Sequence, residues 1–104
     1  MKSFAEKIYE KLKEVPRGRV TTYKGLAVAV GSTAYRAAGQ AMRHNPFAPD
    51  VPCHRVVNSD GKLGGFKGKK SGKEIAEKIR LLTNEGVKIV EGRVKDFETR
   101  KYSF

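Results

Sequence analysis

Cysteine and histidine are scarce in this sequence of 104 residues. Cys53 is the only cysteine, and there are two histidines. A single cysteine excludes an internal disulfide, and one cysteine with two histidines does not make a convincing zinc site. We therefore expect neither a disulfide scaffold nor a metal site, and no cofactor.

Long apolar stretches are also missing. Hydrophobic residues make up 38% of the sequence, and no run approaches the length of a membrane span. Residues 1–6 have no apolar core and no cleavage site, so they do not look like a signal peptide. We predict one intracellular domain over residues 1–104, a cytoplasmic monomer (nucleoid-associated in a prokaryote) with no membrane partner.

Acidic residues are outnumbered by basic ones. Eleven Asp and Glu stand against 22 Lys and Arg, which gives a formal net charge of +11. Such an excess on a small domain suggests a polyanionic partner, most simply nucleic acid. The alternative is a merely soluble, lysine-rich protein, and clustering of the charge would weigh against it.

Residues 52–57, Pro-Cys-His-Arg-Val-Val, place the only thiol beside an imidazole and a permanent cation. Such surroundings make a thiolate easy to form. The two valines predict a short buried strand. On an extended chain Cys53 and His54 would point to opposite faces, so proton transfer between them would need a bridging water or a turn. The alternative is that Cys53 is a small buried hydrophobe, which from spacing alone is the more common case.

Two short helices are predicted in the first half of the chain. Thr22 is a plausible N-cap for a helix over 24–30, and a second helix over 34–44 follows a break at 31–33. Two short helices joined by a glycine-containing turn form the helix-turn-helix pattern. The second helix carries residue types that contact phosphates and base edges: Arg36, Gln40 and Arg43. The alternative is a plain helical hairpin within a core.

Two capping boxes predict helix starts, one from Ser3 to Glu6 and one from Ser71 to Glu74. The second helix should end near Gly86, which leaves Glu85 at a terminus where the helix dipole disfavours a carboxylate. A carboxylate at this unfavourable position suggests that Glu85 has a role other than stabilising the helix.

Residues 62–70, Lys-Leu-Gly-Gly-Phe-Lys-Gly-Lys-Lys, form a glycine-rich basic segment. Glycines let a backbone approach a ligand closely, and lysines suit phosphates. The alternative is a flexible solvated loop. Further on, 87–90 and 93–94 predict a small hairpin, and 96–104 a short tail.

Together these segments resemble the C-terminal, active-site domain of the alkylguanine-DNA alkyltransferases, also called methylated-DNA–protein-cysteine methyltransferases. Residues 52–57 match that family's active-site motif. Residues 36–46 resemble the family's recognition helix with its asparagine hinge, and residues 64–68 resemble its active-site loop. Residues 81–86 resemble the helix end with its glutamate, and residues 18–23 resemble the segment with the substrate tyrosine. The resemblance implies a mainly α fold with a small β component, of the winged helix-turn-helix type.

The chemistry that the resemblance implies is DNA repair by a single-turnover enzyme. An alkyl (methyl) group would pass from O6 of guanine in double-stranded DNA to Cys53. His54 would take the thiol proton through a water, and Glu85 would hold and polarise His54. Tyr23 would give a hydrogen bond or a proton to the departing guanine.

The resemblance also implies how DNA is held. Arg36 would enter the duplex and occupy the space left by a flipped nucleotide, with the helix in the minor groove. The expected DNA contacts are Arg36, Ala37, Ala38, Gly39, Gln40, Arg43, Thr21 and Thr22. The expected pocket and hinge residues are Asn45, Pro52, Arg55, Val56, Gly64, Phe66 and Lys67.

The sequence departs from the family's pattern in places. The family usually has an additional N-terminal domain, for which this chain has no room, and Phe66 stands where relatives often carry tyrosine. Short alkyltransferase-like proteins of this size lack the cysteine and only flag lesions, so Cys53 argues against that interpretation. The alternatives are a lesion-binding module with an unreactive Cys53 and a generic basic helix-turn-helix protein. A thiol hydrolase fits poorly.

Overall fold

The chain forms a mainly helical domain with two small sheets, as the fold prediction states. The computed structural model describes residues 2–48 and 50–104, and Pro49, within the predicted loop over 45–51, lies outside them. The elements in chain order are α1 Phe4–Leu12, β1 Thr21–Thr22, α2 Tyr23–Ala29, α3 Tyr35–Arg43, a 3-10 turn η1 Cys53–Arg55, β2 Val56–Val57, α4 Lys73–Asn84, β3 Ile89–Val90, β4 Arg93–Val94 and α5 Phe97–Arg100.

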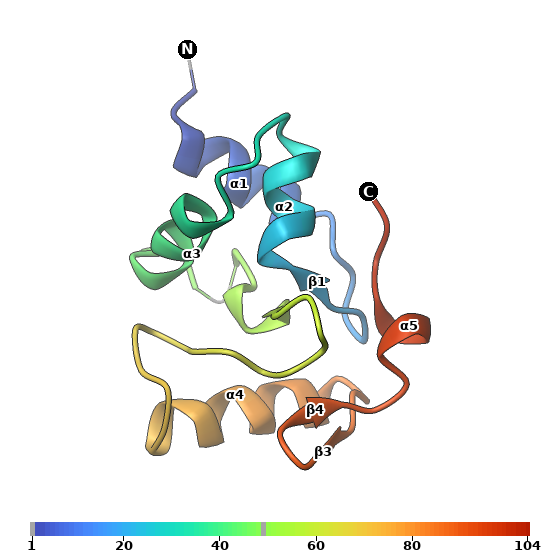
Figure 1. Ribbon diagram of the computed structural model, residues 1–104. Coiled ribbons are helices and arrows are strands. Elements are labelled where there is room, and N and C mark those ends of the chain that lie inside the picture. Colours follow the sequence, from blue (N-terminus) through green and yellow to red (C-terminus); the bar gives the residue numbers. More distant parts are fainter. Residues whose placement is uncertain (1, 49) are drawn as a thin grey trace.

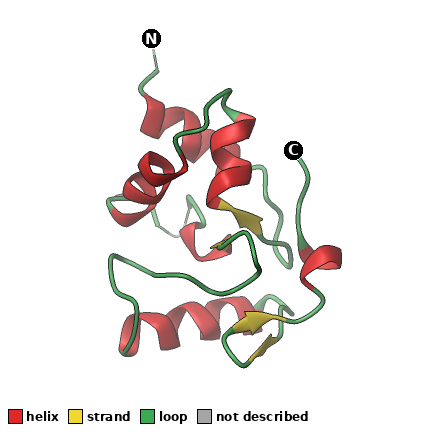
Figure 2. Cartoon of the chain, in the orientation of Figure 1, coloured by secondary structure: helices red, strands yellow, loops and turns green. Residues whose placement is uncertain are grey.

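The helices lie in two groups with the middle of the chain between them (Figure 1). Helices α1, α2 and α3 contact one another in one group. Helix α4 and the β3–β4 hairpin lie opposite, and the long loop after β2 crosses between the groups (Figure 2). Turn η1 contacts α4. None of the helices in the described residues is long and apolar enough to cross a membrane.

Local capping explains where two helices start. The backbone N–H of Glu6 donates to Oγ of Ser3 at 3.1 Å, and the Glu6 carboxylate accepts from the Ser3 N–H, which confirms the first capping box. Oγ1 of Thr22 accepts from the N–H of Gly25 at 2.9 Å, which confirms Thr22 as the cap of α2. The chain between α2 and α3 turns at Gly31, whose φ of +78° suits glycine.

Strand β2 lies between two buried clusters. It pairs in parallel with β1, in the register Thr21 to Val56 and Thr22 to Val57. Val56 belongs to a cluster with the apolar side of α1 and α3, whereas Val57 belongs to a second cluster with Leu82 of α4. Successive strand residues point to opposite faces. The short strand therefore joins the two halves of the core directly after the cysteine-bearing turn.

Two expectations for the second half of the chain are wrong. Helix α4 has Gly72 as its N-cap, with φ +84° and no side-chain capping bond, so Ser71 does not cap it. The predicted tail folds back as α5 and returns beside Val20, which donates to the carbonyl of Arg100 at 2.9 Å and accepts from the N–H of Tyr102 at 2.7 Å. The C-terminal segment is thus tied to the start of β1.

Candidate active site and nucleic-acid interface

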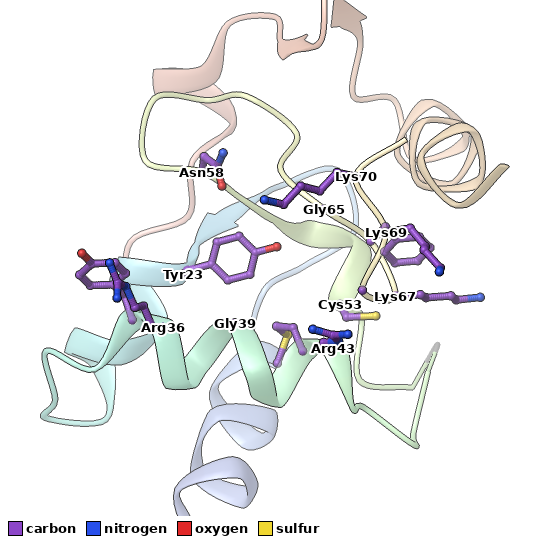
Figure 3. Close-up of a pocket in the computed structure, with 14 residues that line it drawn as sticks. Tyr23, Arg36, Gly39, Arg43, Cys53, Asn58, Gly65, Lys67, Lys69 and Lys70 are labelled. Carbon is purple, nitrogen blue, oxygen red and sulfur yellow. The ribbon is translucent and has the colours of Figure 1, made fainter. Parts of the chain in front are cut away.

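Cys53 lies in the wall of a cavity of about 450 Å³ (Figure 3). The cavity is bounded by α2, α3 and the loop after β2. Its lining consists of Tyr23, Tyr35, Arg36, Gly39, Met42, Arg43, Cys53, Asn58, Gly65, Phe66, Lys67, Gly68, Lys69 and Lys70. The structure therefore brings together residues from four of the five segments that the sequence singled out.

Cys53 sits in the turn η1, not in a strand. Its N–H donates to the carbonyl of Val51 at 2.8 Å, and the N–H of Arg55 donates to the carbonyl of Pro52 at 2.9 Å. The expected alternation of Cys53 and His54 along an extended chain is therefore wrong, because the strand begins only at Val56.

The thiol of Cys53 is protonated at neutral pH. Burial raises its pKa, against the amide of Asn45 and the charges of Lys78 and Lys67, which lower it. The expectation that the neighbouring arginine makes a thiolate easy to form is wrong. Arg55 is directed to Glu85 instead, and it does not line the cavity. A reaction at Cys53 consequently needs a base.

Glu85 joins the two residues that follow the cysteine. Its carboxylate lies 2.8 Å from Nε2 of His54 and accepts two bonds from Arg55, at 2.9 and 2.8 Å. Arg55 also donates to the carbonyl of Val15 at 2.9 Å. Burial alone would raise the pKa of Glu85, but the bonds from Arg55 and His54 prevail and lower it to about 2. The carboxylate at the end of α4 therefore has two partners that outweigh the unfavourable dipole.

The Glu85 contact assigns the tautomer of His54. An ionised carboxylate only accepts, so the proton of neutral His54 is on Nε2 and the lone pair is on Nδ1. Burial lowers the pKa of His54 below its usual 6.5, although the Glu85 bond opposes this. His54 is therefore neutral at physiological pH and has a basic Nδ1.

Tyr23 is the first residue of α2, and its phenol points into the cavity from the side opposite the loop (Figure 3). Burial, and then the charge that Cys53 can acquire, raise the pKa of Tyr23 to about 12. The hydroxyl remains protonated and can donate a hydrogen bond to a group in the cavity.

Asn45 closes the connection between α3 and the cysteine-bearing turn. Its Nδ2 donates to the carbonyl of Val51 at 2.9 Å, and its Oδ1 accepts from the N–H of Phe47 at 2.9 Å. These bonds hold the chain two residues before Cys53, which is the place where the resemblance puts a hinge.

The basic loop after β2 is an ordered turn. The N–H of Phe66 donates to the carbonyl of Lys69 at 2.8 Å, and the reverse bond measures 2.9 Å. Lys67 and Gly68, the two residues between them, both have positive φ, as in a type I′ turn. The ring of Phe66 is buried, whereas Lys67 forms an ion pair of 2.7 Å with Glu77.

Lys78 is a buried residue that sequence reasoning missed. Its side chain is fully buried, and Nζ donates to the carbonyls of Val56, Leu63 and Gly65. Burial lowers the pKa of Lys78 to about 7, whereas three carbonyl acceptors favour the ammonium form because a neutral amine has two N–H donors. One signal was available, since Lys78 shares a helix face with the apolar residues Ile75 and Leu82.

The exposed face of α3 presents most of the residues expected to contact DNA. Arg36, Ala37, Gln40 and Arg43 are exposed, and a Cβ added at Gly39 would meet no atom within 4 Å. Figure 3 shows Arg36 at the end of the cavity away from Cys53.

Several expected site residues lie elsewhere. Ala38 is buried in the core, and the side chains of Thr21 and Thr22 are buried as well, so none of the three offers a side chain to DNA. Val56 is buried and, like Pro52, does not line the cavity. Gly64 lies beside Asn58 in a neighbouring hollow, where an added Cβ would be 2.8 Å from the Asn58 amide oxygen. Cavity residues outside the expected site set are Tyr35, Met42, Asn58, Gly65, Gly68, Lys69 and Lys70, of which the last four belong to the predicted basic segment.

Comparison with known proteins gives one consistent family. Residues 3–87 match the family described as 6-O-methylguanine DNA methyltransferase, DNA binding domain. The methylated-DNA–protein-cysteine methyltransferase of Thermococcus kodakarensis is 51% identical over 86 residues, which are 82% of this chain and 45% of that protein. The DNA base-flipping protein of Thermus thermophilus is 43% identical over 80 residues, 77% of this chain and 50% of that protein. The chain thus spans about half the length of these relatives.

A solved structure matches the whole chain. The structure of Schizosaccharomyces pombe Atl1 in complex with damaged DNA containing O6-carboxymethylguanine has a TM-score of 0.84 and 31% identity, and the match covers 100% of both chains.

Proposed function

The chain belongs to the 6-O-methylguanine DNA methyltransferase family through its DNA-binding domain, and from that premise we propose that it repairs DNA by transferring an alkyl group from O6 of guanine to Cys53. One observation carries the proposal: the only thiol of the chain lines a cavity that is also lined by lysines and arginines, and the next residue, His54, is neutral through burial and oriented by Glu85. The domain acts once per molecule, as a monomer and without a cofactor.

The proposed reaction begins with the proton of the thiol. Nδ1 of His54 takes this proton through a water, because the raised pKa of Cys53 leaves too little thiolate otherwise. The sulfur then attacks the alkyl carbon, the carbon–O6 bond breaks and its electron pair stays on the base. The proton that left Cys53 balances the proton that guanine gains. The products are a thioether at Cys53 and unmodified guanine.

Tyr23 supports the leaving of the base in this proposal. Its hydroxyl enters the same cavity and stays protonated at neutral pH, because its pKa is about 12. A hydrogen bond from the phenol stabilises the negative charge that develops on guanine as the bond to O6 breaks. In this proposal His54 accepts the proton of the thiol, and Tyr23 donates a hydrogen bond to the departing guanine.

DNA binding places the guanine in the cavity. The cavity opens beside α3, whose exposed face carries Arg36, Gln40 and Arg43 and leaves Gly39 open to a close approach. A guanine inside a duplex cannot reach Cys53, so the nucleotide flips out and Arg36 fills the gap in the stack. The buried ring of Phe66 and the hinge at Asn45 fix the walls around the flipped base.

A second candidate is a protein that binds the lesion without transfer. The full-length match to Atl1, which was solved with damaged DNA, favours it, as does the raised pKa of Cys53. The two candidates share the cavity and differ only in the fate of the alkyl group.

Nucleoside analysis of the DNA distinguishes the two candidates. A duplex with one O6-methylguanine is incubated with the protein and with the Cys53→Ser variant, and affinity is measured in parallel. We expect the protein to convert O6-methylguanine to guanine up to one equivalent, and the variant to bind the duplex but convert none. Lesion-selective binding by the unsubstituted protein without any conversion would overturn the transfer proposal in favour of the second candidate.

A further inference from the structure

The cavity around Cys53 is lined by cations without an acidic residue. Of the lining residues in the described part of the chain, five are Arg or Lys and none is Asp or Glu: Arg36, Arg43, Lys67, Lys69 and Lys70. Figure 3 shows that these side chains come from α3 and from the loop, on different walls of the cavity.

These cations are not equally compensated. Lys67 is paired with Glu77 at 2.7 Å and lies over the ring of Phe66, so part of its charge is neutralised outside the cavity. Within residues 2–48 and 50–104, no carboxylate lies within ion-pair distance of Arg36, Arg43, Lys69 or Lys70.

Four of the five lining cations are thus uncompensated in the described residues, with Arg36 and Arg43 on α3 and Lys69 and Lys70 on the loop wall (Figure 3). A Cβ built at Gly68 would lie 2.9 Å from Nε of Arg43, so the guanidinium on α3 reaches the turn of the loop. The backbone of Lys69 is fixed by its two bonds to Phe66. Like charges held around a concave site focus the potential inside it and attract an anion.

We propose that this cavity selects guanines whose O6 substituent carries a negative charge, such as a carboxymethyl group, over neutral substituents of the same size. This inference rests on the proposed function, because it assumes that an O6-alkylguanine occupies the cavity beside Cys53. Arg43, Lys69 and Lys70 then donate charge-assisted hydrogen bonds to the carboxylate. The carboxylate of the substituent is thus a ligand of these cations in addition to the DNA phosphates.

The test compares lesions that differ by one charge. Dissociation constants are measured with the Cys53→Ser variant, which cannot transfer, for duplexes with guanine, O6-methylguanine, O6-carboxymethylguanine and the neutral O6-carbamoylmethylguanine. We expect carboxymethyl to bind about tenfold more tightly than carbamoylmethyl. Adding Lys69→Gln and Lys70→Gln should lower this ratio markedly, with Arg43 left as the remaining donor. Adding Lys88→Gln and Lys95→Gln, which remove the same charge away from this cavity, should leave it unchanged.

The outcomes separate this inference from the proposed function. Because the ratio compares the dissociation constants of two lesions for the same protein variant, any loss of phosphate contacts cancels. The charge selection alone would be overturned if every lesion bound more tightly than guanine but carboxymethyl and carbamoylmethyl bound equally well. It would also be overturned if both double variants lowered the ratio of these two dissociation constants equally. Equal affinity for all four duplexes would overturn the proposed function and this inference with it.

Discussion

Nε2 of His54 lies 2.8 Å from the carboxylate of Glu85, although 31 positions separate the two residues in the chain. The bond joins the turn η1 to the end of α4, and the same carboxylate also holds Arg55. A single side chain therefore sets the tautomer of His54 and fixes the turn that carries Cys53.

Glu85→Gln should slow alkyl transfer by about 100-fold, because a neutral amide stabilises the imidazolium that forms at His54 much less than a carboxylate does. The measurement is the single-turnover rate with methylated duplex DNA. Glu10→Gln is the matched control, since Glu10 pairs with Lys2 on the exposed side of α1. A Glu85→Gln rate within twofold of the control rate would contradict the role of the pair.

The stability of the protein should fall with acid over a defined window. Glu85 has a pKa lowered from 4.5 to about 2, so the unfolded state binds more protons than the folded state between these values. Its stabilising contribution is fully present above about pH 4.5 and is lost as the pH falls towards about 2. Urea unfolding of the protein and of Glu85→Gln should show a gap in the free energy of unfolding that narrows as the pH falls from about 4.5 towards 2. A gap independent of pH would contradict the shift.

Lys78→Met should destabilise the fold by about 3 kcal/mol, because the carbonyls of Val56, Leu63 and Gly65 lose their donor. Lys88→Met, on an exposed residue, should stay within about 0.5 kcal/mol of the original. Both free energies of unfolding come from urea titration. Equal stability of the two variants would show that the buried ammonium does not hold the strand and the loop together.

Arg36→Ala should weaken transfer on duplex DNA by about 100-fold, since nothing then fills the space left by the flipped nucleotide. Transfer from a free O6-alkylguanine base should change little, because a free base needs no flipping. Arg93→Ala, at the exposed position of β4, controls for the lost charge. Equal losses on the duplex and on the free base would refute the proposed role of Arg36.

Local signals predicted much of this fold. The first capping box, the cap at Thr22 and the helix pair before the active-site turn are all present, because each depends on neighbouring residues. The prediction of a second capping box at Ser71 is wrong, for a local reason that the sequence pattern does not include. Gly72 adopts a left-handed φ of +84°, so the helix starts one residue later than Ser71 would set.

Two of the features that the sequence misplaced depend on contacts between distant segments, and one is local. The two valines predicted a strand, which β2 confirms, but the N–H groups of Cys53 and Arg55 donate to the carbonyls of Val51 and Pro52 and form a turn before it. The sequence analysis did not single out Lys78, because its burial depends on carbonyls from two other segments, those of Val56 and Leu63. The arginine next to the thiol suggested a lowered pKa for Cys53. Arg55 instead donates to Glu85, and burial raises the pKa of Cys53.

The most direct test of the transfer proposal is a mass spectrum of the protein after incubation with duplex DNA that carries one O6-methylguanine. We expect one added methyl group per protein at saturation, located on the peptide that contains Cys53. An unmodified Cys53 peptide, from protein that binds the lesion selectively, would contradict the transfer and leave a lesion-binding protein in its place.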